Sequence, residues 1–191
     1  MRAILPPLMT RIASSRAAPA VALAALLLVA LLLRLGVVAA IPHFFGSGDP
    51  SVYYASAKGC LAHGVPRIEF VWHFLTAPPQ VAHVEDYCEP GFAYLLAIPT
   101  GLFGGGVRGA MMLSVICGTL TVWCVFRYAR RFGVPCALLA AALVALEPWS
   151  IYYGGLIMKE AAVALVVVLF MAAARRQLAA AQPSPRAAAA L

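Results

Sequence analysis

The chain has 191 residues, of which 63% are hydrophobic and 11% are charged, and its mean hydropathy is +0.90. Soluble domains carry about 25% charged residues, so this composition excludes an ordinary soluble protein and indicates an integral membrane protein. The formal charge of +7 could indicate nucleic-acid binding, but many basic residues flank hydrophobic runs and no basic stripe interleaved with aromatic residues is present. We therefore expect the lipid bilayer, and no nucleic acid, among its partners.

The first hydrophobic run, residues 20–41, is long enough to cross a bilayer, which takes about 20 residues. Three arginines lie in the preceding segment, residues 1–19, and the positive-inside rule places that segment in the cytoplasm. A cleaved signal peptide is the alternative, because small residues lie near the end of the run. The run is longer than a usual signal core and Arg34 interrupts it, which favours a retained transmembrane helix.

Residues 42–106 follow as a long exterior loop. In it, Asp49 as an N-cap and Pro50 at the first helical position predict the start of a helix, which Gly64 ends. Three residues at helical spacing predict one face of this helix: Tyr54, Ala57 and Leu61. Tyr53 and Tyr54 also suit an aromatic belt at the level of the lipid head groups.

The next apolar stretch, residues 91–103, is shorter than a usual span, and its placement decides the topology. If it crossed the membrane, Arg127, Arg130 and Arg131 would face the exterior, against the positive-inside bias. If it lies in the membrane interface, those arginines and the pair Arg175–Arg176 face the cytoplasm. All seven carboxylates of the chain then lie outside, so we predict an interfacial segment that ends at three consecutive glycines.

Three further spans are predicted, at residues 107–126, 135–149 and 161–174. The segments between and after them are a cytoplasmic turn at 127–134, a second exterior loop at 150–160 and a cytoplasmic tail at 175–191. The predicted fold class is therefore an all-α integral membrane protein of the cell's inner (plasma) membrane. It has about four transmembrane helices, and its exterior loop carries amphipathic juxtamembrane helices.

The cysteines and histidines offer no metal-binding motif. No C-x-x-C is present, and the four histidines lack the spacing of a zinc site. Cys60 and Cys88 both fall in the exterior loop and could pair in an oxidising compartment.

Four residues are candidates for chemistry, each with a simpler structural reading beside it. Asp49 could act as a general base on an acceptor hydroxyl, or cap a helix, and the two roles are compatible. Arg34 could hold a lipid phosphate, or extend to the head groups, and Lys159 could bind phosphate or be a rim charge. Glu160 could be a metal ligand, or an acid that favours the N-terminus of the last span.

The order of these parts resembles the N-terminal portion of membrane glycosyltransferases with the C-type fold, which include protein O-mannosyltransferases and aminoarabinose transferases. The stretches that carry the resemblance, spread over most of residues 20–175, are Leu33-Arg34, Gly48-Asp49, Tyr53, Ala57, Leu61, Gly64, Glu89-Pro90-Gly91-Phe92, Leu102-Phe103-Gly104, the turn at 127–133, 145–148, Tyr152-Tyr153 and Glu160.

The resemblance implies an inverting transfer of a sugar from a polyprenyl-phosphate donor to an acceptor on the exterior face. By this likeness Asp49 is the catalytic base and Glu160 occupies the second-loop acidic position, a tentative metal ligand. Arg34, Lys159 and Tyr53 are the candidate substrate-binding residues.

Some members of these families use a divalent metal and others do not, so a requirement for Mg or Mn stays open. Members also carry further spans, so the chain resembles a fragment of such an enzyme. The alternative is a non-catalytic membrane module that binds lipid or a partner chain.

Overall fold

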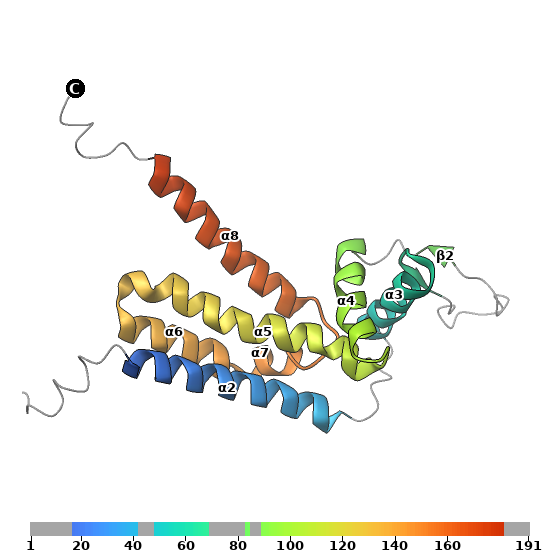
Figure 1. Cartoon of the computed structure of the whole chain (residues 1–191), viewed down its shortest axis with the longest axis horizontal. Coiled ribbons are helices and arrows are strands. Elements are labelled where there is room, and N and C mark those ends of the chain that lie inside the picture. The colour runs from blue at the N-terminus through green and yellow to red at the C-terminus, as the bar shows by residue number, and fades with distance from the viewer. Residues whose placement is uncertain (1–16, 42–47, 69–82, 85–88, 182–191) are drawn as a thin grey trace, which may run out of the picture.

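The computed structural model describes residues 17–41, 48–68, 83–84 and 89–181. Three helices lie side by side as a bundle: α2 (Ala17–Ala40), α5 (Val107–Ala129) and α6 (Val134–Leu146). A short 3-10 turn, η1 (Arg130–Phe132), joins α5 to α6, and α7 (Pro148–Tyr153) follows α6 (Figure 1). The last helix, α8 (Glu160–Ala181), starts against α5 and diverges from the bundle (Figure 1).

Small side chains allow the three bundle helices to approach one another closely. Ala30 of α2 packs with Val122 of α5 and with one face of α6, and all are fully buried. That face of α6 consists of alanines at helical spacing: Ala137, Ala141 and Ala145. In a bilayer, where lipid tails are as apolar as leucine, close packing of small residues is what favours helix association.

The other elements gather at one end of the bundle, which we call the loop end: α3 (Asp49–His63), β1 (Arg67–Ile68), β2 (His83–Val84) and α4 (Pro90–Leu102). The two strands pair antiparallel over two residues each. Tyr53, Phe92, Met111 and Ile157 are buried in one core that joins α3, α4, α5 and the segment before α8. The opposite end of the bundle, the arginine end, carries the α5–α6 turn and faces the diverging end of α8 (Figure 1).

The all-α membrane fold class is confirmed. Among the described residues, three helices are long and apolar enough to cross a membrane, namely α2, α5 with its 3-10 extension, and α8. The predicted third span is interrupted, because Glu147 leaves the helical conformation and Pro148 starts α7. The Glu147 side chain accepts hydrogen bonds from the Trp149 and Ser150 backbone N–H groups, which caps α7. Whether α6 and α7 make the fourth crossing stays a prediction.

Helix α4 runs across the end of the bundle, not along its axis (Figure 1). This orientation agrees with the predicted interfacial segment, although the membrane topology itself stays a prediction. A turn with positive φ at Gly104 and Gly105 ends α4, as the run of glycines predicted. Tyr54 fixes this turn, because its hydroxyl donates a hydrogen bond to the Gly105 carbonyl (2.7 Å).

Several local predictions for α3 need correction. Gly48, not Asp49, is the N-cap, and no side chain caps the helix, because Asp49 is already the first helical residue. Leu61 is 51% exposed, whereas Tyr53 is 3% exposed. The buried face of α3 is therefore rotated away from Leu61 toward Tyr53, and Tyr53 does not belong to the predicted aromatic belt. The predicted end is correct, since Gly64 adopts the left-handed conformation and its N–H bonds the Cys60 carbonyl. The proposed partner of Cys60, Cys88, lies outside the described residues.

Candidate functional site

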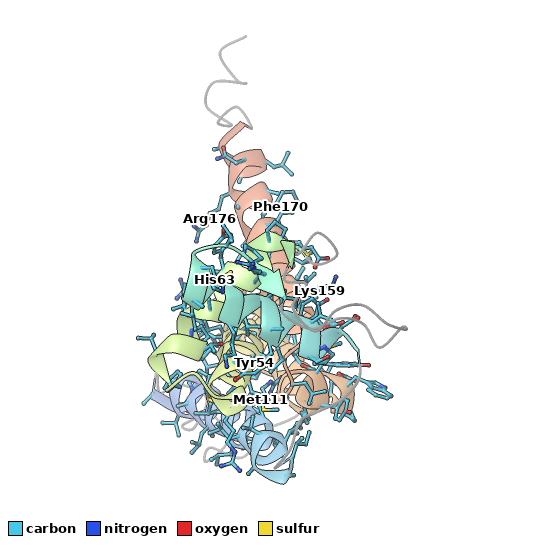
Figure 2. All side chains as sticks on the ribbon, turned by 90° about the vertical axis from the view of Figure 1, so that its right-hand side faces the viewer. Tyr54, His63, Met111, Lys159, Phe170 and Arg176 are labelled. Carbon is cyan, nitrogen blue, oxygen red and sulfur yellow. The ribbon has the colours of Figure 1, made fainter. Side chains whose placement is uncertain are left out.

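An ion pair at the loop end connects two segments that lie far apart in the sequence. Lys159 Nζ donates a hydrogen bond to Glu89 Oε1 (2.5 Å), which joins the start of α8 to the start of α4. The segment before Lys159 is held by α5, because the buried Ser114 hydroxyl donates to the Met158 carbonyl (3.1 Å). Lys159 therefore projects from a fixed backbone at the loop end, where Figure 2 labels it.

The ring of Tyr53 is the third member of this cluster. It packs edge-to-face on Phe92 with centroids 5.0 Å apart, and Lys159 Nζ lies 6.0 Å from its centroid. Burial raises the pKa of the Tyr53 hydroxyl, and the nearby Lys159 only partly offsets this. The hydrogen bond to Glu89, and then the nearby hydroxyl of Tyr53, raise the pKa of Lys159 well above its usual range. The same bond lowers the pKa of Glu89, so both charges of the pair are present at neutral pH.

Asp49 lies next to this cluster and is exposed. It stands four residues before Tyr53 on α3, so both project from the same side of the helix. Its negative charge is close enough to contribute to the raised pKa of the Tyr53 hydroxyl. Gly48, which precedes it, has φ of 124°, a conformation that favours glycine. The structure thus brings Asp49, Tyr53 and Lys159 to one region of the loop end.

Two apolar cavities run along α8, one on each side of it. The first, of about 300 Å³, lies between α4 and α8 and has Glu89 and Lys159 among its lining residues. The second, of about 450 Å³, lies between α8 and the bundle and has Glu160 among its lining residues. Val167 lines both. The neighbouring residues Lys159 and Glu160 thus contribute to different cavities, and Glu160 does not join the ion pair.

Arg34 is fully buried, so the expectation that it extends to the head groups is wrong. Its guanidinium donates to the Ala30 carbonyl (3.0 Å) and to the Ser150 hydroxyl (2.8 Å), which ties α2 to α7. A Cβ at Gly118 would lie 2.5 Å from Arg34 Nε, and one at Gly154 would lie 2.7 Å from it. Only glycine at these two positions leaves room for the buried side chain.

Arg34 also lies beneath the larger cavity, because Gly118, Ser150 and Gly154 line that cavity and touch the arginine. Within the described residues its Nε has no hydrogen-bond partner. In this conformation the side chain is a link between helices, and a phosphate could reach it only after the neighbouring residues move.

The described residues do not fit a metal site built by the protein. Among them, no three His, Cys, Asp or Glu side chains gather at one place. Glu160, the tentative ligand, has no second carboxylate beside it in the cavity that it lines.

Sequence reasoning missed the role of three residues here. The sequence places Glu89 among the seven acids and in one of the stretches that carry the resemblance, but assigns it no role, and it gives no role to Gly118 or Gly154. The sequence does carry a signal for Glu89, because Pro90 marks the start of a helix and places Glu89 directly before it. The Glu89 side chain does not cap this helix, so it can bind another partner. Nothing local in the sequence marks the two glycines, since their partner lies on another helix.

The fold and this site define a polytopic membrane protein with polar groups gathered at one end of its apolar helices. A family model described as dolichyl-phosphate-mannose-protein mannosyltransferase matches residues 88–188, which is 101 of the 191 residues. The chain belongs to this family, a group of membrane glycosyltransferases. The matched range contains Glu89, Lys159 and Glu160 but not Asp49. No curated protein and no solved structure matches the chain.

Proposed function

We propose that the chain transfers a sugar from a polyprenyl-phosphate donor to an acceptor hydroxyl at the loop end, on the exterior face of the plasma membrane. The observation that carries this proposal is the α4–α8 cavity, which is apolar along α8 and has Lys159 and Glu89 at its loop end. A donor of this class has the same division, with a charged phosphate joined to a long apolar chain. The family membership supports the reaction class.

Lys159 is the residue that we assign to the donor phosphate. An ammonium group has three N–H donors, and the hydrogen bond to Glu89 uses one of them. Donors are thus left for a phosphate oxygen, and the raised pKa keeps the group charged throughout the physiological range. Tyr53 keeps Lys159 at the mouth of the cavity and contributes to substrate binding from there.

Asp49 is the residue that we assign as general base. Its carboxylate takes the proton of the acceptor hydroxyl while the acceptor oxygen attacks the anomeric carbon of the sugar. A new carbon–oxygen bond forms on one face, and the bond to the phosphate oxygen breaks on the other. The configuration inverts, the bonding electrons leave with the phosphate, and the proton stays on Asp49.

The test is transfer from a radiolabelled polyprenyl-phosphate sugar by membranes that contain the chain. Asp49→Asn, which keeps the shape and removes the base, is expected to lower the rate of transfer by about 100-fold or more. Glu147→Gln is the matched control, because Glu147 is an exposed acid outside both cavities and the amide oxygen of glutamine can still accept a hydrogen bond that caps α7. Equal rates for Asp49→Asn and the parent chain would remove Asp49 from the mechanism.

The second candidate function is a non-catalytic module that binds lipid, which the same apolar cavities favour. Polyprenyl phosphate bound with equal affinity by the parent chain and by Asp49→Asn, with no transfer by either, would support this function instead.

A further inference from the structure

A third cavity lies at the arginine end, between the last turns of α5 and the distal half of α8. Its volume is about 190 Å³, and three arginines line it: Arg127 from α5, and Arg175 and Arg176 from α8. Trp123 and Leu169 belong to its apolar wall. Figure 2 shows Arg176 far along α8 from Lys159, so this cavity is remote from the proposed transfer site.

No carboxylate of the described residues faces these arginines. None of the described acids lines this cavity, and the ion pair between Glu89 and Lys159 lies at the loop end. The sequence itself contains no acid between Glu89 and Glu147 and none after Glu160. Three guanidinium groups around one small cavity repel one another unless an anion lies among them. The arrangement calls for an anion that comes from outside the chain.

Two further arginines of the described residues lie at this end. Arg131 lies over the rings of Tyr128 (4.1 Å) and Phe132 (4.4 Å), and Arg130 lies near the ring of Phe126 (6.0 Å), as Arg127 of the cavity does near the ring of Trp123 (5.6 Å). Neither Arg130 nor Arg131 lines the cavity. The positive-inside bias accounts for the number of arginines at this end, but it does not require three of them to converge between two helices.

We propose that this cavity binds the phosphate-bearing head group of an anionic phospholipid from the leaflet at the arginine end. The guanidiniums match the phosphate oxygens, and basic pockets between transmembrane helices are suited to such head groups. The apolar wall favours a lipid over a free phosphate ion, because an acyl chain can lie against Trp123 and Leu169. Val168 lines this cavity and the larger one closer to the middle of the helices, so the apolar surface continues inward. The proposal does not depend on the transfer reaction.

The position of Trp123 in the wall provides a direct probe. The chain has three tryptophans, so Trp72→Phe together with Trp149→Phe leaves Trp123 as the only one. This variant is reconstituted into two kinds of phosphatidylcholine vesicles. The first kind contains phosphatidylglycerol with brominated acyl chains, and the second contains phosphatidylcholine with brominated acyl chains instead. We expect brominated phosphatidylglycerol to quench Trp123 more strongly than brominated phosphatidylcholine does at the same mole fraction.

The double substitution Arg175→Gln and Arg176→Gln is expected to weaken this preference for phosphatidylglycerol by about fivefold or more. Each basic residue near an anionic surface strengthens binding by a factor of that order. The matched control is Arg130→Gln with Arg131→Gln, which removes the same charge from the same end at two residues that do not line the cavity. Far-UV circular dichroism of both variants checks that the helices are retained.

Equal losses in the two double variants would overturn the proposal, because diffuse surface charge would then explain the preference. Equal quenching by the two brominated lipids would also overturn it. Inorganic phosphate that releases the lipid more effectively than chloride at the same ionic strength would support recognition of the phosphate group. Tighter binding of free phosphate than of phosphatidylglycerol would overturn the assignment to a lipid.

Discussion

Helices α5 and α8 have nearly the same length and are both apolar enough to cross a bilayer, yet they differ in how much of them the protein covers. In the most apolar part of each, 61% of the residues are buried in α5 but only 6% in α8. Helix α5 presents small residues such as Gly109, Ser114 and Gly118 to its neighbours. Helix α8 exposes large ones instead, among them Val163, Val166 and Phe170.

The difference teaches that hydropathy alone decides whether a helix can lie in a membrane, while small residues decide what it packs against. The uncovered helix is the one that carries all three cavities, so the sites proposed above depend on α8 being loosely packed.

The largest expected effect is at the most crowded point of α5. In Gly118→Ala the new Cβ would lie 2.5 Å from Arg34 Nε, so the buried arginine must shift and strain its bond to Ser150. We expect the free energy of unfolding to fall by about 1–3 kcal/mol, as for other overpacked sites. Steric trapping in bicelles can measure it. Gly36→Ala on α2 is the control, because nothing lies within 4 Å of its Cβ. Equal stability of the two variants would contradict the tight packing around Arg34.

A matched pair of substitutions compares the two helices directly. Val122 on α5 is fully buried, whereas Val166 on α8 is 62% exposed. We expect Val122→Ala to lower the free energy of unfolding by about 1–2 kcal/mol, because the lost side chain leaves a space that its neighbours fill only partly. Val166→Ala is expected to change it by less than about 0.5 kcal/mol. A substantial loss of stability in Val166→Ala would mean that α8 is covered in the membrane.

The α4–α8 cavity can be filled without touching its polar end. Val163 lines this cavity, and Phe170 on the same helix does not. We expect Val163→Trp to raise the KM for the polyprenyl-phosphate donor by about tenfold, as for one misfit group in an apolar pocket. Phe170→Trp should leave the KM unchanged. An unchanged KM in both variants would place the donor elsewhere.

The smallest effect concerns the ion pair that links α4 to α8. The pKa of Glu89 is lowered from its usual 4.5, so its contribution to stability is complete above that pH and disappears as the pH falls through the lowered value. The pKa of Lys159 is raised from 10.5, so its contribution is lost only as the pH rises beyond that value.

Between these limits Glu89→Gln should therefore unfold slightly more readily than the parent chain, and the two should converge in acid. Chemical denaturation over a range of pH measures this difference. Since both side chains are exposed to solvent, high salt should also reduce it. A difference that persists in acid would mean that Glu89 acts other than through its charge.

The sequence was sufficient to predict the apolar helices and the glycine ends at Gly64 and Gly104, because these depend on local composition and backbone freedom. It was not sufficient for the face that α3 buries. That face depends on Phe92 and Lys159, which contact Tyr53 from other segments and leave Leu61 outside.

The environment of Arg34 could not be predicted for the same reason. An arginine near the end of an apolar run usually reaches the head groups, and only the packing of α7 and two distant glycines makes a buried position possible here. For the candidate site, sequence reasoning named Asp49, Tyr53, Lys159 and Glu160. It could not foresee that Lys159 and Glu160 line separate cavities, because that depends on where α8 leaves the bundle.

Lys159 is the last residue before α8, and Glu160 is the first residue of this helix. Because the two residues line different cavities, the start of α8 acts as a partition with a cation toward one chamber and an anion toward the other. Since Val167 lines both cavities, a tilt of α8 that increases the volume of one cavity decreases the volume of the other. A molecule that binds in either cavity must then change the volume of the other.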